Sequence, residues 1–389
     1  MYIFNSKIED AGKLENSLVG RNLIVDQLEK MVIETANHGT LFQNIIIGPR
    51  GSGKTHLLKV LYNRIHANRK ILGKIEIAYM AEDEVGIGKF FDFLVRIFAA
   101  FTRWDDDENK IEWLQEKIEE LKIVNENERE EKAKRILLEY LKGKDLIILI
   151  ENMDAVFNGL KKTGQSKLRD FIQQYTNVSF IATSQALFNG IRNEDMPFHN
   201  FFNITHLKKL TFQETIDLII KLARLENHDD LIAFVRTDEG RGKIKAINEF
   251  TQGNHRLIVL FYDFLKTEFK ADLSEPFLKT IDKLKPYYES FLKLLSPQQQ
   301  RIVQYLSLKR NPQTGKGISQ NCFIPHNTIS KQMSELQRLG YIAAHKVGKE
   351  RYYELNEPLL RFCFEISEDR NGIIKIFIDL SGISILHKS

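Results

Sequence analysis

A glycine-rich segment follows a short apolar run near the start of the chain, and it restricts the possible folds more than any other feature. Residues 44–56 read NIIIGPRGSGKTH, in which Ile45 to Ile47 predict a strand buried on both faces. The glycines allow a sharp return of the backbone, so that its N–H groups converge on phosphate groups. A helix opening at Thr55 would direct the partial positive charge of its N-terminus at the same anion. Strand, loop and helix together predict a phosphate-binding loop within an α/β sheet.

Two side chains of this loop would contact a nucleotide directly. Lys54 would reach the β- and γ-phosphates, and the hydroxyl of Thr55 would hold Mg²⁺. ATP with Mg²⁺ is therefore the expected cofactor. The loop residues predicted to bind it are Gly48, Pro49, Arg50, Gly51, Ser52, Gly53, Lys54, Thr55 and His56.

Composition fits such a protein and excludes several other classes. The 389 residues allow two or three domains, and 43% hydrophobic with 28% charged residues is ordinary for a globular chain. The N-terminus lacks the layout of a signal peptide, and no apolar run approaches membrane-spanning length, so we expect a cytoplasmic protein with no membrane partner. Two cysteines, Cys322 and Cys363, are too few for a disulfide framework or a zinc site. Mg²⁺ is thus the only metal expected.

Four more apolar segments follow the loop and alternate with helical patterns. They occupy residues 74–80, 145–151, 178–184 and 201–207. Short buried strands that alternate with helices predict a parallel sheet covered on both faces. The charged stretch at residues 104–141 is predicted to be a solvated helix, because its apolar residues recur at helical spacing. These residues are Ile111, Leu114, Ile118 and Leu121.

The strand at residues 145–151 runs into the polar sequence ENMD. Glu151 is placed to bind the Mg²⁺ shell, and Asn152 falls where ATPases commonly carry a catalytic carboxylate. A carboxamide can orient water but cannot accept its proton, which predicts slow hydrolysis. In an alternative alignment Glu151 is itself the base, assisted by Asp154 or a water molecule. A third interpretation is a buried strand that ends in a polar turn without catalytic function.

Three more motifs lie outside the phosphate-binding loop. They read LVGR at residues 18–21, FIATSQ at residues 180–185 and GNHR at residues 253–256. With the loop, they make residues 18–269 resemble the AAA+ and STAND-type P-loop ATPases, particularly the origin-recognition initiator branch and its archaeal relatives. The resemblance implies an α/β core with a helical lid after it, and ATP with Mg²⁺ as the cofactor.

The resemblance also implies functions for single residues. In that family the LVGR box packs against the adenine, a polar residue at the tip of the fourth strand senses the γ-phosphate, and the lid arginine reaches back to the nucleotide. The polar residue is Gln185 or, alternatively, Ser184. Arg256 is the lid arginine, since its guanidinium fork matches a phosphate, unless it is an ordinary residue at the start of a helix. The adenine box supplies Val19, Gly20 and Arg21, and the candidate catalytic residues are Lys54, Glu151, Asn152, Gln185 and Arg256.

One family feature is in doubt. Members that act as rings present an arginine just before the fifth strand, and here only Arg192 lies near that place. An arginine supplied to a neighbouring subunit is therefore not supported. Self-association or an unidentified protein partner stays open.

A second pattern begins at Ser296. Ser296 and Pro297 predict the start of a helix. A short helix at residues 318–322, a turn, a helix at 326–339 that stops at Gly340, and strands at 341–346 and 351–355 follow. This order resembles the winged helix-turn-helix modules of MarR- and ArsR-like regulators.

The helix at residues 326–339 would turn small polar and cationic side chains outward, as a helix in the major groove requires. Residues 286–356 hold ten Lys or Arg against four Glu, a net charge of +6, whereas the whole chain carries +4. Such a local excess predicts duplex DNA as a partner. Winged helices also serve as protein-interaction or structural modules. The candidate DNA-binding residues are Asn327, Thr328, Ser330, Lys331, Ser334, Arg338, Lys346, Lys349 and Arg351.

The expected fold class is α/β: a P-loop NTPase parallel sheet with helices on both faces, then an α-helical lid and a winged helix-turn-helix. The expected parts are an N-terminal arm (1–17), a core (18–207), a lid (208–290), a winged helix (291–367) and a C-terminal extension (368–389). The leading functional hypothesis is an ATP-dependent DNA-binding switch. A STAND-like signalling or phage-defence ATPase with a protein-binding or autoinhibitory winged helix is the alternative, followed by a transcription regulator with a vestigial nucleotide fold.

Overall fold

A computed structural model provides the structure of the protein. It describes residues 11–81, 86–105, 107–175, 177–269, 286, 288–289, 292–309, 311–347, 350–356 and 360. The chain divides into two compact units, each built from separate segments. The sheet unit holds residues 21–49 and 54–207, and the helical unit holds residues 1–20, 50–53 and 208–389.

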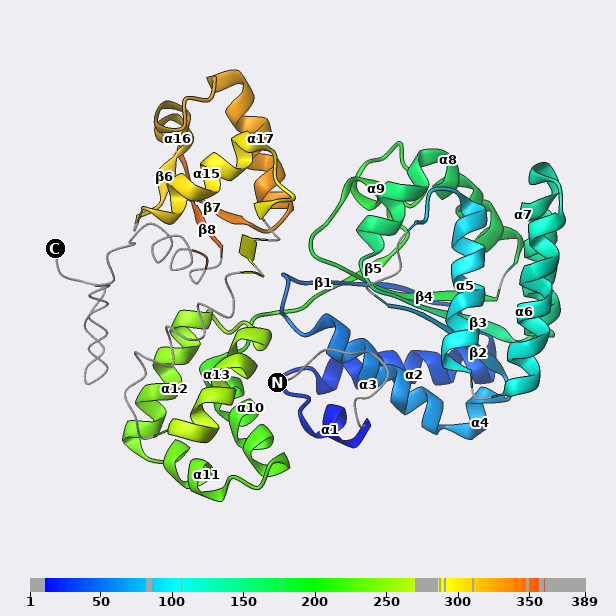
Figure 1. Ribbon diagram of the computed structural model, residues 1–389, viewed down its shortest axis with the longest axis horizontal. Coiled ribbons are helices and arrows are strands. Elements are labelled where there is room, and N and C mark those ends of the chain that lie inside the picture. The colour runs from blue at the N-terminus through cyan, green and yellow to red at the C-terminus, as the bar shows by residue number, and fades with distance from the viewer. Residues whose placement is uncertain are drawn as a thin grey trace. The chain divides into compact units, whose positions relative to one another are not determined.

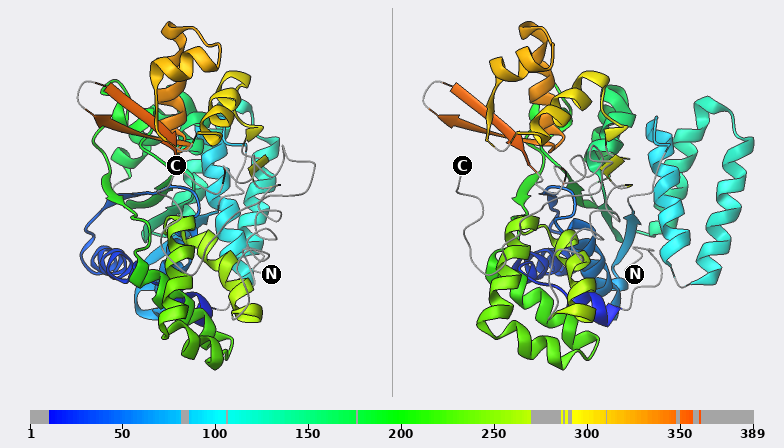
Figure 2. Two further views of the ribbon diagram at one scale, coloured as in Figure 1. Left: turned by 90° about the vertical axis from the view of Figure 1, so that its left-hand side faces the viewer. Right: turned by 60° about the vertical axis from the view of Figure 1, so that its left-hand side comes forward.

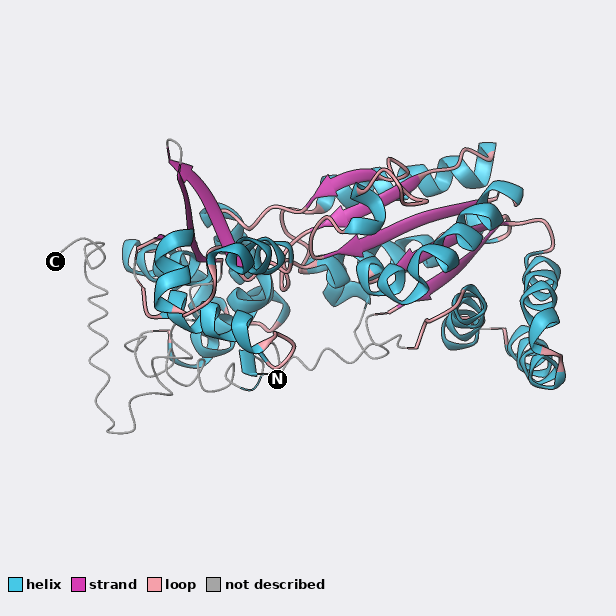
Figure 3. Ribbon diagram, turned by 90° about the horizontal axis from the view of Figure 1, so that it is seen from above, coloured by secondary structure: helices cyan, strands magenta, loops and turns pink. Residues whose placement is uncertain are grey.

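A five-stranded parallel sheet forms the centre of the sheet unit (Figure 1; Figure 3), which confirms the predicted α/β fold. The strand order is β2-β3-β4-β1-β5, and every neighbouring pair is parallel. Parallel pairing needs crossover connections, which the intervening helices supply. The strands are β1 (Gln43–Ile47), β2 (Ile75–Met80), β3 (Asp145–Ile150), β4 (Val178–Ser184) and β5 (Asn203–His206).

The strands differ in burial, and the two edge strands differ most. Every residue of β2 and β4 is buried. The prediction that all strands are buried is wrong for β5, an edge strand in which Ile204 is 46% exposed. The other edge strand, β2, is buried because α5 packs against it. The sequence pattern could not reveal this difference, since the packing of helices on strands is a property of the folded chain.

Helices cover both faces of the sheet. Successive side chains of a strand point to opposite faces and therefore pack against different helices. Ile45 and Ile47 of β1 join a hydrophobic core with side chains of α5, α7 and α8, while the buried Ile46 points to the other face. Figure 1 places α2 and α3 across the sheet from α8. The helices are α2 (Asn22–His38), α3 (Lys54–Ala67), α4 (Arg69–Leu72), α5 (Phe90–Trp104), α6 (Glu108–Ile123), α7 (Glu126–Leu141), α8 (Met153–Gln174) and α9 (Asn189–Arg192).

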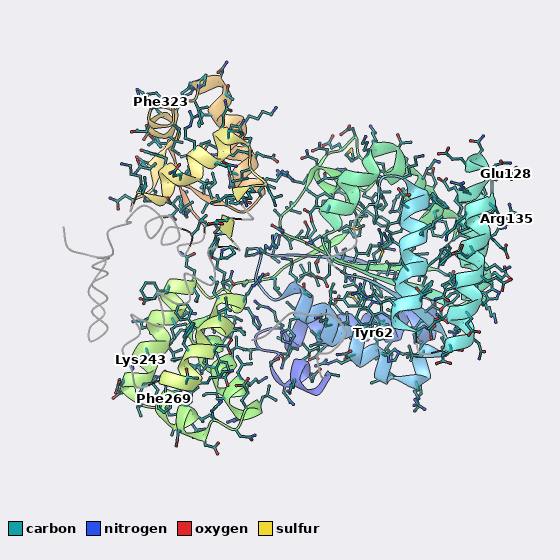
Figure 4. The ribbon with its side chains drawn as sticks, in the orientation of Figure 1. Tyr62, Glu128, Arg135, Lys243, Phe269 and Phe323 are labelled. Atoms are coloured by element: carbon teal, nitrogen blue, oxygen red, sulfur yellow. The ribbon has the colours of Figure 1, made fainter. Side chains whose placement is uncertain are left out.

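The charged stretch after β2 differs from its prediction. It forms two helices, α6 and α7, rather than one, and both pack beside α5 (Figure 2). The backbone is extended at Val124, and α7 starts after Asn125. Leu114 and Leu121 are buried, so the apolar stripe of α6 contributes to the core. The outer surface of α7 is charged and includes Glu128 and Arg135, which Figure 4 labels.

The helical unit contains two groups of elements. The first is a set of helices after the sheet, of which α10 starts with a capping box formed by Thr211 and Glu214. A short N-terminal helix, α1 (Ala11–Asn16), contacts α10. The first group comprises α10 (Phe212–Leu225), α11 (Asp229–Val235), α12 (Asp238–Thr251) and α13 (His255–Glu268).

The second group combines three helices with a small antiparallel sheet of order β6-β8-β7. Ser296 and Gln299 form a capping box at the start of its first helix, with Pro297 in the first turn as predicted. The two-residue strand β6 was not predicted. The elements are α15 (Pro297–Ser307), β6 (Gln313–Thr314), α16 (Gly315–Asn321), α17 (His326–Arg338), β7 (Ile342–Val347) and β8 (Glu350–Leu355). Within the described ranges, no helix has both the length and the apolar character needed to cross a membrane.

Candidate functional site

The glycine-rich loop joins β1 to α3, and its lysine is held against the loop backbone. The N–H of Gly48 donates to Ser184 O at the end of β4, at 3.1 Å. Lys54 is only 9% exposed, and its Nζ donates to Gly48 O at 2.6 Å and to Pro49 O at 3.1 Å. An ammonium that faces a concave loop backbone is the arrangement that binds phosphate.

Within the helical unit, the loop residues from Arg50 to Gly53 contact the start of α13. The φ angle of Gly51 is +76°, and a Cβ there would lie 2.5 Å from Asn254 Oδ1. Asn254 caps α13 and donates from Nδ2 to Arg50 O at 3.0 Å. The backbone N–H of Arg256 donates to Gly51 O, also at 3.0 Å. The GNHR signature and the loop are therefore in direct contact, and Gly51 is the residue that permits it.

Glu151 directly follows β3 and meets the first turn of α3. Its side chain is buried, with 6% exposed. The hydroxyl of Thr55 donates to Glu151 Oε2, and the hydroxyl of Tyr79 donates to Oε1 at 2.6 Å. A carboxylate in contact with a hydroxyl supplies the hard oxygen ligands that suit Mg²⁺, so these residues fit the expected ion. Sequence reasoning missed Tyr79, although it is the tyrosine at the carboxyl end of a fully buried strand.

Asn152 occupies the turn between β3 and α8. Its φ of +53° and ψ of +51° lie in the left-handed region, which asparagine tolerates better than most residues. The backbone N–H of Asn152 donates to Thr183 Oγ1 at 3.3 Å. Because β3 and β4 are adjacent and parallel, their carboxyl ends meet, and Asn152 lies beside β4. Thr183 was not among the predicted site residues.

The two candidates for the γ-phosphate sensor have different surroundings. The hydroxyl of Ser184 donates to Asp154 Oδ1 at 3.1 Å and to Ala186 O at 2.8 Å. Gln185 comes directly after β4 and is half-buried. Ser184 is thus engaged in fixing the turn next to Asp154. Gln185 lies just beyond the end of β4, which is the position expected for the γ-phosphate sensor.

The residues of the LVGR box belong to both units: Leu18, Val19 and Gly20 to the helical unit and Arg21 to the sheet unit. Val19 is buried in the hydrophobic core of the helical unit, and Lys221 of α10 donates from Nζ to Leu18 O at 2.7 Å. A Cβ on Gly20 would lie 2.4 Å from Glu214 Oε1, also on α10. Arg21 is buried and precedes α2 in the sheet unit. Arg192, the remaining candidate for an arginine finger, is exposed at the last position of α9.

The candidate DNA-binding residues of α17 lie on its outer side, opposite the buried Ile329, Met333 and Leu336. Thr328 and Arg338 are half-buried. Arg338 forms hydrogen bonds with Glu335, including one from Nε to Oε2 at 3.0 Å, and this partner holds the pKa of the Glu335 carboxyl below its usual value. The exposed members are Asn327, Ser330, Lys331 and Ser334.

The hairpin of β7 and β8 carries the remaining DNA candidates. Lys346 and Arg351 are exposed and lie opposite each other in the antiparallel pair. The two positive charges therefore lie at the same level along the hairpin, one on each strand. Lys349 lies outside the described residues.

Comparisons with known proteins place this fold. No family model and no curated protein matches the sequence. The structure is similar to the Walker-type ATPase paby2304 of Pyrococcus abyssi, at 14% sequence identity and a TM-score of 0.63, over 90% of this chain and 96% of that one. It is also similar to the ORC2 protein of Aeropyrum pernix, whose structure contains ADPNP and ADP. Identity there is 13% and the TM-score 0.55, over 90% of this chain and 95% of that one. The chain has the fold of these archaeal P-loop ATPases.

Proposed function

We propose that the chain is an ATP-binding switch that hydrolyses ATP slowly and binds duplex DNA through residues 291–367. The observation that carries the nucleotide part is the contact of Thr55 with Glu151 one residue from the buried Lys54. These three side chains come from the start of α3 and the end of β3, the places where a P-loop ATPase needs them.

Each group of this site has a separate task in the proposal. The backbone of residues 48–53 and the ammonium of Lys54 bind the phosphates, and Thr55 and Glu151 hold Mg²⁺. Tyr79 fixes one carboxylate oxygen of Glu151, which keeps the other directed at Thr55. Bound Mg²⁺ would neutralise charge on the phosphate oxygens. The guanidinium of Arg256 on α13 is proposed to add a cation for the phosphates, because its fork of donors matches a phosphate.

Asn152 explains why hydrolysis is proposed to be slow. It follows the Mg²⁺-binding Glu151 at the position where a general base is expected, and a carboxamide has no basic site for the proton of water. A long-lived ATP state suits a switch. It also suits the second candidate function, a STAND-like signalling or defence ATPase, in which the α15–α17 group would bind protein instead of DNA.

We further infer that the second group of the helical unit, formed by α15, α16, α17 and the sheet of β6, β7 and β8, is a winged helix. Helix α17 would enter the major groove, and the β7–β8 hairpin would contact phosphates. Support comes from the exposed polar side chains at the start of α17 and from the cations of the hairpin. Lys331 and Arg351 are both exposed.

The DNA part is tested by the salt dependence of binding to a duplex. Changing Lys331, Lys349 and Arg351 together to alanine should weaken binding by at least about tenfold and make the slope of log K against log salt shallower by about 3, because each lost phosphate contact accounts for roughly 0.9. Fluorescence anisotropy with a labelled duplex measures both. A control variant replaces three exposed lysines of the sheet unit, Lys30, Lys70 and Lys122, and should bind as the wild type does. Absence of wild-type binding even at low salt would favour the signalling alternative.

A further inference from the structure

The turn between α16 and α17 exposes a phenylalanine in an unfavourable backbone conformation. Phe323 is 86% exposed, and Figure 4 labels it on this turn. Its φ of +53° lies in the left-handed region, where a glycine would be free of strain. An exposed ring also leaves apolar surface in water. In the isolated chain, this residue therefore carries two costs that glycine would avoid.

The turn itself is firmly held, so the exposure of the ring is a feature of the fold. Cys322 and Ile324, on either side of Phe323, are both buried. The guanidinium of Arg301 donates to Cys322 O at 3.0 Å, and the hydroxyl of Ser319 donates to Ile324 O at 2.6 Å. With both neighbours fixed, the ring of Phe323 is held in its exposed position.

The surroundings of the ring indicate the chemistry of that partner. Residues 296–339 hold six Lys or Arg and one acidic residue, Glu335, which is bonded to Arg338. Arg301 anchors the turn, and Lys316 and Lys331 are exposed on the helices before and after it. The exposed His326 and Asn327 come three and four residues after the ring. An aromatic ring in a cationic and polar setting suits a polyanion that also has apolar surfaces. Duplex DNA has both, in its phosphates and in the thymine methyl groups of the major groove.

We propose that Phe323 is a specificity-determining DNA contact whose ring packs against thymine methyl groups. The proposal rests on the DNA binding proposed above. A recognition helix contacts base edges with its N-terminal residues, and Phe323 lies three residues before His326, the first residue of α17. The ring would favour sites with thymine at the matching position, and its contact with DNA would offset the cost of exposing it.

The test separates a binding residue from a structural one. Phe323→Gly removes the ring and relieves the left-handed strain, so its melting temperature should equal or exceed that of the wild type, while its affinity for duplex DNA falls about tenfold. Phe323→Asn, which also tolerates the left-handed region, should lose the same affinity, and Phe323→Tyr should keep it. Leu23→Ser removes an apolar side chain that is 78% exposed on α2, and should leave DNA affinity unchanged.

A second duplex tests the base that is read. When uracil replaces thymine, the methyl groups are lost, so the wild type should bind more weakly, whereas Phe323→Gly should bind both duplexes equally. If the wild type binds DNA but the Gly and Asn variants match it, the inference is overturned and the DNA function stands. A wild type that treats thymine and uracil duplexes alike overturns it in the same way. If the wild type binds no DNA, the proposed function fails and this inference with it.

Discussion

Replacing Lys54 with alanine should raise the dissociation constant for ATP by about 10- to 100-fold, the range expected when a charge-assisted hydrogen bond worth roughly 1.5–3 kcal/mol is lost. The ammonium is buried and bonded to Gly48 O and Pro49 O, so its charge lies against the loop backbone. Alanine keeps the helix and removes the side chain that carries that charge. Isothermal titration of the purified full chain with ATP and Mg²⁺ measures the effect.

A matched control is available on the neighbouring helix. Lys30→Ala on α2 removes an exposed lysine that pairs with Glu34, and ATP affinity should not change. Unchanged affinity in Lys54→Ala would mean that the loop is not the nucleotide site. The hypothesis of a regulator with a vestigial nucleotide fold would then be favoured.

Changing Asn152 to glutamate should increase ATP turnover by about 10- to 100-fold. A positioned general base contributes roughly 10²- to 10⁴-fold, and glutamate at the φ of +53° found here pays about 1–2 kcal/mol of backbone strain. The net gain should therefore lie at the low end. Steady-state release of phosphate, measured at saturating ATP, tests it.

Two further variants identify the base. Asn152→Ala should turn over no faster than the wild type, because it adds no basic group. Glu151→Gln keeps a similar shape at the contacts with Thr55 and Tyr79 but removes the charge that we propose holds Mg²⁺. If Asn152→Glu shows no gain, and Glu151→Gln abolishes turnover while it still binds ATP with Mg²⁺, Glu151 is the base and the alternative alignment is correct.

The parallel sheet could be predicted because β1 to β4 are apolar runs separated by helical patterns. Other features depend on the folded chain. The break between α6 and α7 lies at Val124 and Asn125, where neither glycine nor proline interrupts the helical pattern. The edge position of β5 follows from the order of strands, which no local pattern encodes.

In the candidate site, too, local motifs could be predicted from the sequence and contacts between distant residues could not. The sequence pattern predicts Lys54, Thr55 and Glu151 as site residues because the loop and the strand end are short, local motifs. Tyr79 was missed because its partner Glu151 is 72 residues away and meets it only through the pairing of β2 with β3. The bond of Asn254 to Arg50 spans 204 residues and was equally hidden.

Nucleotide binding and DNA binding should be linked, and because linkage is reciprocal, one titration tests it. The measurement is the affinity of the full chain for a duplex with ATP, with ADP and without nucleotide, at one fixed salt concentration and with Lys54→Ala alongside. The ATP and ADP affinities should differ by about fivefold or more, a typical coupling for two linked sites, and the difference should vanish in Lys54→Ala. Equal affinities in all three states of the wild type would contradict a nucleotide-controlled DNA switch.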